Sequence, residues 1–397
     1  MNNQEIVAAA GQVLMPTYAR FPLALVRGEG TRVWDADGRV YLDFLAGIAV
    51  CALGHCHPAL VAAIREQAGT LLHVSNLYHI EPQVRLARLL VEQTFADKVF
   101  FCNSGAEANE AAIKLARKWQ KDQGQPDRTE IVSALQSFHG RTLATLTATG
   151  QDKVKIGFAP LPTGFLTVPY DDAAALDAAV GEHTAAVLLE PVQGEGGIRV
   201  PSPGYLQAAR EICDRAGALL ILDEVQTGIG RTGLFLGCDH EGVAPDICSL
   251  AKGLGGGVAI GACLATDAVA SSFGPGTHAT TFGGNPLATA AACAVVQTLL
   301  DEGVLGRCRE TGAYFMERLK ALASTSAAVA AVRGRGLLIG VELAGGRPAG
   351  PLVGELMDRG FLAGTAGESV LRFAPPLTVE PNEIDALLAA LGDLLAD

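Results

Sequence analysis

The chain has 397 residues, 49% hydrophobic and 18% charged, which is enough to bury a large core in a globular protein of two or three domains. Its formal net charge of −12 argues against nucleic acid or an anionic membrane as the main partner. Because no stretch approaches 18 consecutive apolar residues, no membrane span is expected, and the first residues lack the pattern of a signal peptide. The nine cysteines are scattered and odd in number, as is typical of reduced thiols, so we expect a cytoplasmic protein.

The N-terminal part reads as a helix, a turn and short strands. Residues 23–47 alternate apolar and polar side chains around glycine-containing turns, as hairpins do. A helix is then expected near Pro58, since proline favours the first helical turn. His55, Cys56 and His57 are metal ligands by residue type, but further ligands are lacking nearby. We therefore interpret them as a turn and predict no metal site.

After an amphipathic helix at residues 81–93, an apolar strand at 99–102 turns into a long helix. Ser104 and Glu107 at the start of this helix have the spacing of a capping box. The free backbone N–H groups and the dipole of such a helix start can bind a phosphate group. Taken alone, however, a capping box usually does no more than begin a helix.

Strands and helices alternate between residues 129 and 257, which predicts a mostly parallel, doubly wound sheet. The strand at 219–222 ends in Asp223 and Glu224, and ligands bind at the carboxyl ends of strands in such sheets. A second apolar segment leads to Lys252, which a run of glycines follows. A lone lysine is usually solvated. A lysine in apolar surroundings, downstream of a strand-end aspartate, suggests a Schiff-base lysine with a pyridinium partner.

The pattern changes after residue 286. A long alanine-rich helix at 286–303 and a helix at 312–323 precede two strands and a C-terminal helix, which indicates a smaller α+β domain. We expect residues 1–55 to pack with this small domain at 296–397, and residues 56–295 to form the large domain.

Many motifs in one order resemble the class III (ω) aminotransferases, fold type I enzymes that use pyridoxal 5'-phosphate. The resemblance covers essentially the whole chain and rests on GIAVCALGHCHP, FCNSGAEANEAAIKLAR, SFHGRTLATLTATG, LLEPVQGEGG, LDEVQTGIGRTG, LAKGLGGG, HATTFGGNPLA, GRGLLIGVEL and VLRFAPPL. It implies an α/β fold with a large cofactor-binding domain and a small α+β domain. It also implies a homodimer whose active sites are shared between subunits.

The resemblance assigns the cofactor contacts residue by residue. Lys252 would form the Schiff base and later move a proton, and Asp223 would pair with the pyridinium nitrogen. Phe138 would stack on one face of the ring, with Val225 against the other and Gln226 on the ring oxygen. The remaining cofactor-binding positions are Ser104, Gly105 and Ala106 for the phosphate, Glu224, and Thr281 from the neighbouring subunit.

Two arginines are implied to bind substrate carboxylates, since the planar guanidinium can bind a carboxylate through two hydrogen bonds. Arg141 would bind the α-carboxylate of the ω-amino substrate, and Arg372 that of glutamate or 2-oxoglutarate. Glu195 would pair with Arg372 and release it when glutamate enters. The other implied positions are Tyr18 and Thr280 beside the substrate and Glu190 in support; Cys51 and His139 receive no role.

The choice of substrate depends on Ile48, where ornithine-specific members have a tyrosine that helps to hold the free α-amino acid head. An apolar residue leaves room for an acylated amine and offers no hydroxyl to a free ammonium. We therefore expect transfer of the δ-amino group of N2-acetyl-L-ornithine to 2-oxoglutarate, a step of arginine biosynthesis. The alternatives are succinylornithine or N-succinyl-diaminopimelate, then ornithine or 4-aminobutyrate, or a mutase or racemase of the same family.

Overall fold

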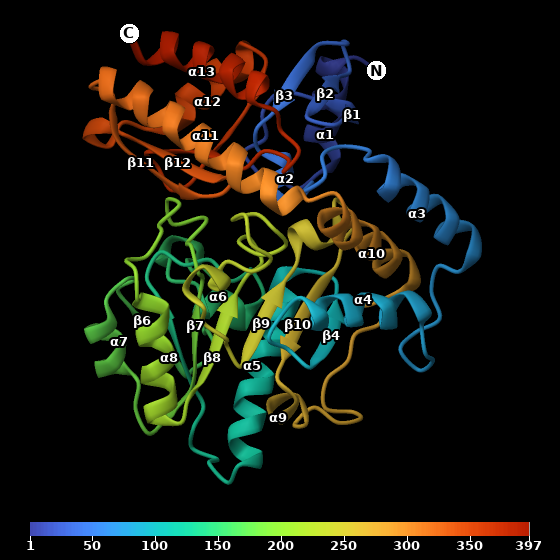
Figure 1. The fold of residues 1–397 in the computed structure, drawn as a ribbon, viewed down its shortest axis with the longest axis vertical. Helices are drawn as coiled ribbons and strands as arrows, with labels where there is room; N and C mark the ends of the chain where they lie inside the picture. Colours follow the sequence, from blue (N-terminus) through green and yellow to red (C-terminus); the bar gives the residue numbers. More distant parts are fainter. Residues whose placement is uncertain (397) are drawn as a thin grey trace.

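A seven-stranded sheet forms the centre of the molecule (Figure 1). In the computed structural model residues 1–396 are described, and Asp397, the last residue of the predicted small domain, lies outside them. The strands lie in the order β4 (Lys98–Cys102), β10 (Gly261–Ala265), β9 (Ile247–Leu250), β8 (Leu219–Asp223), β7 (Thr184–Leu189), β5 (Glu130–Ala134) and β6 (Phe165–Val168). Six of them run in the same direction, and β10 runs antiparallel to both of its neighbours. The predicted mostly parallel sheet is confirmed.

Helices cover both faces of this sheet because its central strands are apolar on both sides. Ile221 of β8 belongs to a core shared with α5 (Gly105–Asp122), whereas Leu220 and Leu222 belong to a core shared with α8 (Tyr205–Ala216). Successive strand residues point to opposite faces, so an unbroken apolar run is what two covered faces require. The shorter helices of this region are α6 (Leu143–Ala148), α7 (Ala173–Ala179) and α9 (Asp267–Ala270).

Two smaller sheets lie beside the large one, and the N-terminal strands pair with a C-terminal strand. The first sheet contains β1 (Leu25–Glu29), β2 (Arg32–Asp35), β3 (Val40–Asp43) and β13 (Phe361–Leu362). The second contains β11 (Val329–Arg335), β12 (Leu338–Leu343), β15 (Val370–Phe373) and β14 (Gly364–Thr365). Because β13 runs parallel to β3, residues from the two ends of the chain share one sheet, and Figure 1 shows both termini on this side.

The helices of the two ends pack around these sheets and link them to the large one. They are α1 (Asn3–Val13), α2 (Ala46–Ala49), α3 (Pro58–Thr70), α4 (Glu81–Glu92), α10 (Pro286–Asp301), α11 (Val304–Thr325), α12 (Ala349–Asp358) and α13 (Pro381–Ala396). Four 3₁₀ helices, Asp152–Val154, Cys238–Glu241, Lys252–Gly255 and Ala344–Gly346, complete the elements of residues 1–396. As predicted, Pro58 is the first residue of its helix.

Helix α10 is apolar and largely buried, and it meets α11 at a sharp bend. Among residues 1–396, no single helix has the length and apolarity to cross a membrane. In the described part of the chain, the pair α10 and α11 together reaches that length and composition, and the two helices are bent by 69° at the break between them.

Candidate active site

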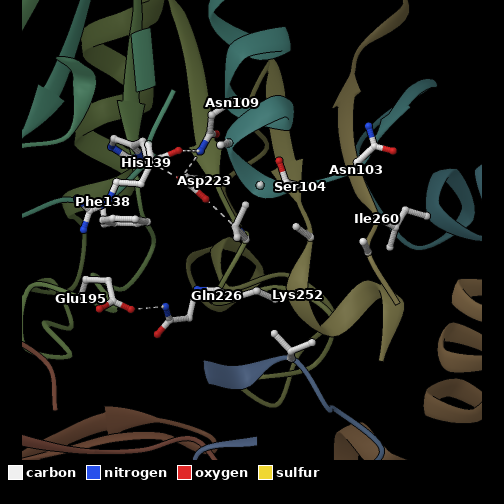
Figure 2. Close-up of a pocket in the computed structure, with 18 of the residues that line it drawn as sticks. Asn103, Ser104, Asn109, Phe138, His139, Glu195, Asp223, Gln226, Lys252 and Ile260 are labelled. Carbon is white, nitrogen blue, oxygen red and sulfur yellow. Dashed lines mark hydrogen bonds and ion pairs between the residues drawn. The ribbon is translucent and has the colours of Figure 1, made fainter. Parts of the chain in front are cut away.

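A cavity of about 430 Å³ opens at the carboxyl ends of the parallel strands, beside the start of α5 (Figure 2). Ten of the residues predicted for cofactor or substrate line it: Ser104, Gly105, Ala106, Phe138, Arg141, Glu195, Asp223, Val225, Gln226 and Lys252. They come from segments far apart in the sequence, which the sheet brings to one edge because the carboxyl ends of its parallel strands meet there.

Lys252 lies two residues after the end of β9 and begins the 3₁₀ helix Lys252–Gly255. Its φ of 43° is rare for a residue with a side chain, and such strain is typical of functional sites. Burial lowers the pKa of its ammonium group, and this effect outweighs that of the neighbouring Glu195 carboxylate, which raises it. A larger fraction of Lys252 is therefore neutral near pH 7 than for a solvated lysine, as a proton-accepting amine requires.

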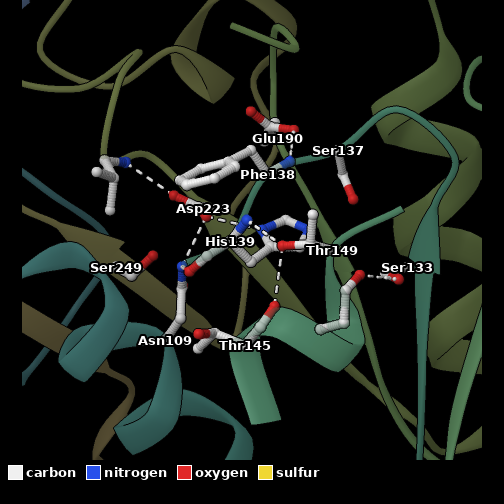
Figure 3. Close-up of polar contacts among 12 residues, drawn as sticks. Asn109, Ser133, Ser137, Phe138, His139, Thr145, Thr149, Glu190, Asp223 and Ser249 are labelled. Carbon is white, nitrogen blue, oxygen red and sulfur yellow. Dashed lines mark hydrogen bonds and ion pairs between the residues drawn. The ribbon is translucent and has the colours of Figure 1, made fainter. Parts of the chain in front are cut away.

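Asp223, at the end of β8, is buried and accepts three hydrogen bonds (Figure 3). Its Oδ2 accepts from Asn109 Nδ2 at 2.7 Å and from His139 Nδ1 at 2.8 Å, and its Oδ1 accepts from the backbone N–H of Val225 at 3.0 Å. Asn109 Nδ2 also donates to the carbonyl of His139 at 2.8 Å, which ties the two donors together. The carboxylate is thus fixed in orientation by groups from three segments.

The roles of Asn109 and His139 were missed by sequence reasoning. His139 directly follows the stacking Phe138, and Asn109 lies one turn into α5, so both were adjacent to predicted site residues. Their residue types alone carried no signal, because a buried polar side chain becomes informative only when its partner is known. In the folded chain the His139 ring is almost fully buried and contacts Asp223.

The start of α5 is shaped to bring backbone close to a ligand. Ser104 caps the helix, accepting from the N–H of Glu107 at 3.2 Å. A Cβ added at Gly105 would lie 2.8 Å from Val225 Cγ1, so only glycine fits between the helix and this side chain. The first amides of the helix remain available to an anion at the positive end of its dipole.

The predicted capping box is only half formed, and this expectation was wrong in its second half. The Glu107 carboxylate does not return to Ser104, but accepts from the backbone N–H of Asn103 at 2.6 Å and from its side-chain amide at 2.8 Å. Asn103 also donates to Thr280 Oγ1 at 3.2 Å. Glu107 therefore braces the turn that precedes the helix.

Glu195 and Arg372 form an ion pair at one side of the cavity, as predicted. Arg372 is almost fully buried on β15, whereas Glu195 is partly open to the cavity. Burial alone would raise the pKa of Glu195, but the positive charges of Arg372 and Lys252 outweigh it, so the net pKa is lowered and the group stays ionised. Gln226 Nε2 lies 3.5 Å from the same carboxylate.

Arg141, Phe138 and Glu190 form another wall. Arg141 is exposed at the mouth, with its guanidinium carbon 5.4 Å from the ring centroid of Phe138. Glu190 accepts from the backbone N–H of Phe138 at 3.2 Å and of Gly194 at 3.3 Å. Burial raises the pKa of Glu190 well above its usual value, and the nearby Asp223 charge adds to this. Glu190 thus orients the loop that carries Phe138.

Five predicted residues do not line this cavity, and one of them is Arg372, which pairs with the lining residue Glu195. The Glu224 carboxylate accepts from the backbone N–H groups of Gly237 and Cys238, both at 2.8 Å, and from the hydroxyl of Thr227. Thr280 and Thr281 border a separate hollow, and Thr281 is exposed. Tyr18 is 73% exposed in the N-terminal segment and borders a third hollow.

The triplet at residues 55–57 forms a turn, as interpreted. His55 Nε2 lies 2.8 Å from Asp43 Oδ2, and this hydrogen bond raises the pKa of His55 to about 10. Within residues 1–396, no group of three or more histidine, cysteine, aspartate or glutamate side chains could hold a metal ion.

The residues around the cavity fit pyridoxal phosphate. Lys252 supplies an amine for its aldehyde, and Asp223 supplies a fixed carboxylate for its ring nitrogen. The start of α5 supplies free backbone amides for its phosphate. The buried Oε1 of Gln226 has no hydrogen-bond partner in the described chain, so a polar group of a ligand can satisfy this side chain.

Comparison with known proteins agrees with this geometry. The family described as aminotransferase class-III matches residues 14–395. An acetylornithine aminotransferase of Caldanaerobacter subterraneus subsp. tengcongensis is 53% identical over 97% of each chain, and one of Methanothermobacter thermautotrophicus is 48% identical over 100% of each chain. The solved ornithine aminotransferase of Toxoplasma gondii ME49 has a TM-score of 0.96 at 36% identity, covering 100% of this chain and 95% of that one. The acetylornithine aminotransferase structure from Elizabethkingia anophelis has a TM-score of 0.89 at 33% identity, covering 100% and 99%. The chain therefore belongs to the class III aminotransferases, which use pyridoxal phosphate as their cofactor.

Proposed function

We propose that this enzyme transfers the δ-amino group of N2-acetyl-L-ornithine to 2-oxoglutarate, producing N-acetyl-L-glutamate 5-semialdehyde and L-glutamate. The observation that carries the proposal is the Arg372–Glu195 ion pair beside Lys252, because it lets one site serve two differently charged substrates. The relatives at 48–53% identity, all acetylornithine aminotransferases by name, support the choice of amine.

When bound, pyridoxal phosphate supplies an aldehyde that captures the amine and a ring that accepts the electron pair left on the neighbouring carbon. Lys252 Nζ would take the proton from that carbon and return it to the former aldehyde carbon of the cofactor, which its lowered pKa favours. Asp223 would stabilise the protonated ring nitrogen, and the hydrogen bonds from Asn109 and His139 keep its carboxylate in place. Phe138 and Val225, which line the cavity, would contact the ring and exclude water.

The two half-reactions use the arginines differently. While Glu195 neutralises Arg372, the exposed Arg141 at the mouth binds the α-carboxylate of the acylated amine. When glutamate or 2-oxoglutarate enters, its α-carboxylate replaces Glu195 on Arg372. Ile48, 42% exposed, offers no hydroxyl to a free α-ammonium, which favours an acylated amine.

We further propose a cytoplasmic homodimer in which Thr281 of each subunit contacts the phosphate in the other. Thr281 is exposed and lies outside the Lys252 cavity of its own chain, so its side chain is accessible to a second subunit. We also propose that residues 1–55 pack with a small domain at 296–397, and that residues 56–295 form the cofactor-binding domain. The pairing of β13 with β3 supports this division.

The test is a scan of single half-reactions, followed through the absorbance of the cofactor. Acetylornithine should react faster than succinylornithine, N-succinyl-diaminopimelate, 4-aminobutyrate and free ornithine. After this half-reaction, the cofactor should return to its starting absorbance only when 2-oxoglutarate is added. Much faster turnover of free ornithine would overturn the substrate assignment. Lys252→Ala should lose the absorbance band of the Schiff base that Lys252 would form with the cofactor, and retention of that band would exclude Lys252 from this role.

A further inference from the structure

Three residues form one row across the second small sheet, on three neighbouring strands. Arg333 of β11 lies opposite Gly340 of β12, and Gly340 lies opposite Arg372 of β15. Directly opposed residues of antiparallel strands point to the same face. The two arginines therefore stand on one face, with a gap between them where Gly340 has no side chain.

The loop at residues 193–199, which carries Glu195, lies across this row and contacts both arginines. Glu195 pairs with Arg372, and Arg333 Nε donates to the carbonyl of Gly197 at 2.8 Å. Between these contacts, the fully buried Ile198 fills the gap above Gly340, where an added Cβ would lie 2.9 Å from Ile198 Cβ. The loop is thus bound to the same sheet that presents Arg372.

The backbone of this loop is strained where it is held. Ile198 has a φ of 51°, and a β-branched residue with positive φ is a genuine outlier that persists only when its surroundings enforce it. Reciprocal hydrogen bonds between the backbones of Gln193 and Arg199, both 3.0 Å, close the base of the loop. The contacts with Arg333 and Gly340 help to hold its tip in this conformation, together with the hydrogen bond from Arg199 Nε to the carbonyl of Gly196 at 3.0 Å.

We propose that Arg333 is a positioning residue that holds the 193–199 loop so that Glu195 competes with the substrate carboxylate for Arg372. This inference rests on the proposed function for the roles of the two half-reactions. Without the Arg333 contact, the strained loop relaxes and Glu195 leaves Arg372 more readily. Dicarboxylate substrates then bind more tightly, whereas the acylated amine meets an arginine that is no longer neutralised and binds less well.

The experiment measures glutarate binding to the holoenzyme by calorimetry, because glutarate has two carboxylates but neither an amino nor a keto group. A hydrogen bond from a charged donor corresponds to a factor of about ten or more in an equilibrium constant, so Arg333→Gln should lower the Kd for glutarate about tenfold. Arg333→Lys, which keeps the charge, should give a smaller decrease. Arg335→Gln makes the same change two residues along β11 and should leave the Kd as it is in the wild type.

Steady-state kinetics provide the second measurement. Arg333→Gln should lower KM for 2-oxoglutarate and raise KM for acetylornithine, whereas a purely structural defect would reduce kcat with both substrates alike. Unchanged or weaker glutarate binding in Arg333→Gln would overturn the proposal; if that variant does not fold, the same result in Arg333→Lys would do so. Preference of the wild type for free ornithine would end the proposed function but leave the glutarate result valid, since glutarate binding tests the Arg372–Glu195 pair and the loop that holds it without any amine substrate.

Discussion

The hydrogen bonds to Asp223 lead to a prediction for His139→Phe, which keeps an aromatic ring but removes one of the two donors to Oδ2. Asn109 then remains as the single donor to Oδ2, with the Val225 N–H on Oδ1, so the orientation of the carboxylate is less firmly fixed. A hydrogen bond to a charged group contributes about 1.5–3 kcal/mol, and a loss of that size in the transition state slows a reaction about ten- to a hundredfold. We expect this decrease in the rate of each half-reaction, because Asp223 serves both.

The assay is single-turnover kinetics on cofactor-loaded enzyme, with acetylornithine in one half-reaction and 2-oxoglutarate in the other. Asn109→Leu should slow both to a similar degree, and the double variant should be less impaired than the two single effects multiplied, since both donors share one oxygen. The far-ultraviolet circular dichroism of each variant serves as the control for folding. Rates within about twofold of wild type, or a loss confined to one half-reaction, would refute the reasoning.

Three other changes test separate parts of the molecule. Gly105→Ala places a Cβ 2.8 Å from Val225 Cγ1, so cofactor affinity, measured by titration of the apoenzyme, should fall by about 1–3 kcal/mol; unchanged affinity would contradict the close packing. Arg372→Ala should reduce kcat/KM for 2-oxoglutarate by a factor that corresponds to about 2–5 kcal/mol of transition-state binding, and an equal loss with acetylornithine would argue against its assignment. His55→Gln removes an ion pair with Asp43 whose stabilisation is fully present below pH 6.5, the usual pKa of histidine, and is lost as the pH rises through about 10. Its destabilisation, about 1–3 kcal/mol in thermal unfolding, should therefore appear near pH 6 and vanish above pH 10, and a loss that does not depend on pH would exclude the pair as its cause.

The architecture of the large sheet and the edge at which its site lies could be predicted from the sequence. Unbroken apolar runs such as that of β8 require burial on both faces, and this requirement leads to a parallel sheet with helices on either side. Asp223 and Lys252 follow such strands, so their side chains had to reach the same edge.

The direction of individual side chains could not be read in the same way. Asp223 and Glu224 are adjacent carboxylates with the same pattern around them, yet one faces the cavity and the other binds the backbone at Gly237. Successive residues of an extended chain point to opposite sides, and only the packed structure decides which side holds the cavity.

Residue type and position relative to apolar strands were enough to identify the groups that could do the chemistry, namely the amine, the carboxylates and the arginines. The contacts that hold these groups in place became visible in the folded chain. Asn109 and His139 reach Asp223 from separate segments, and Arg333 reaches the loop of Glu195 from a strand more than a hundred residues away. Contacts of this kind depend on the alignment of strands and on which side chains are buried together, and local sequence patterns carry neither.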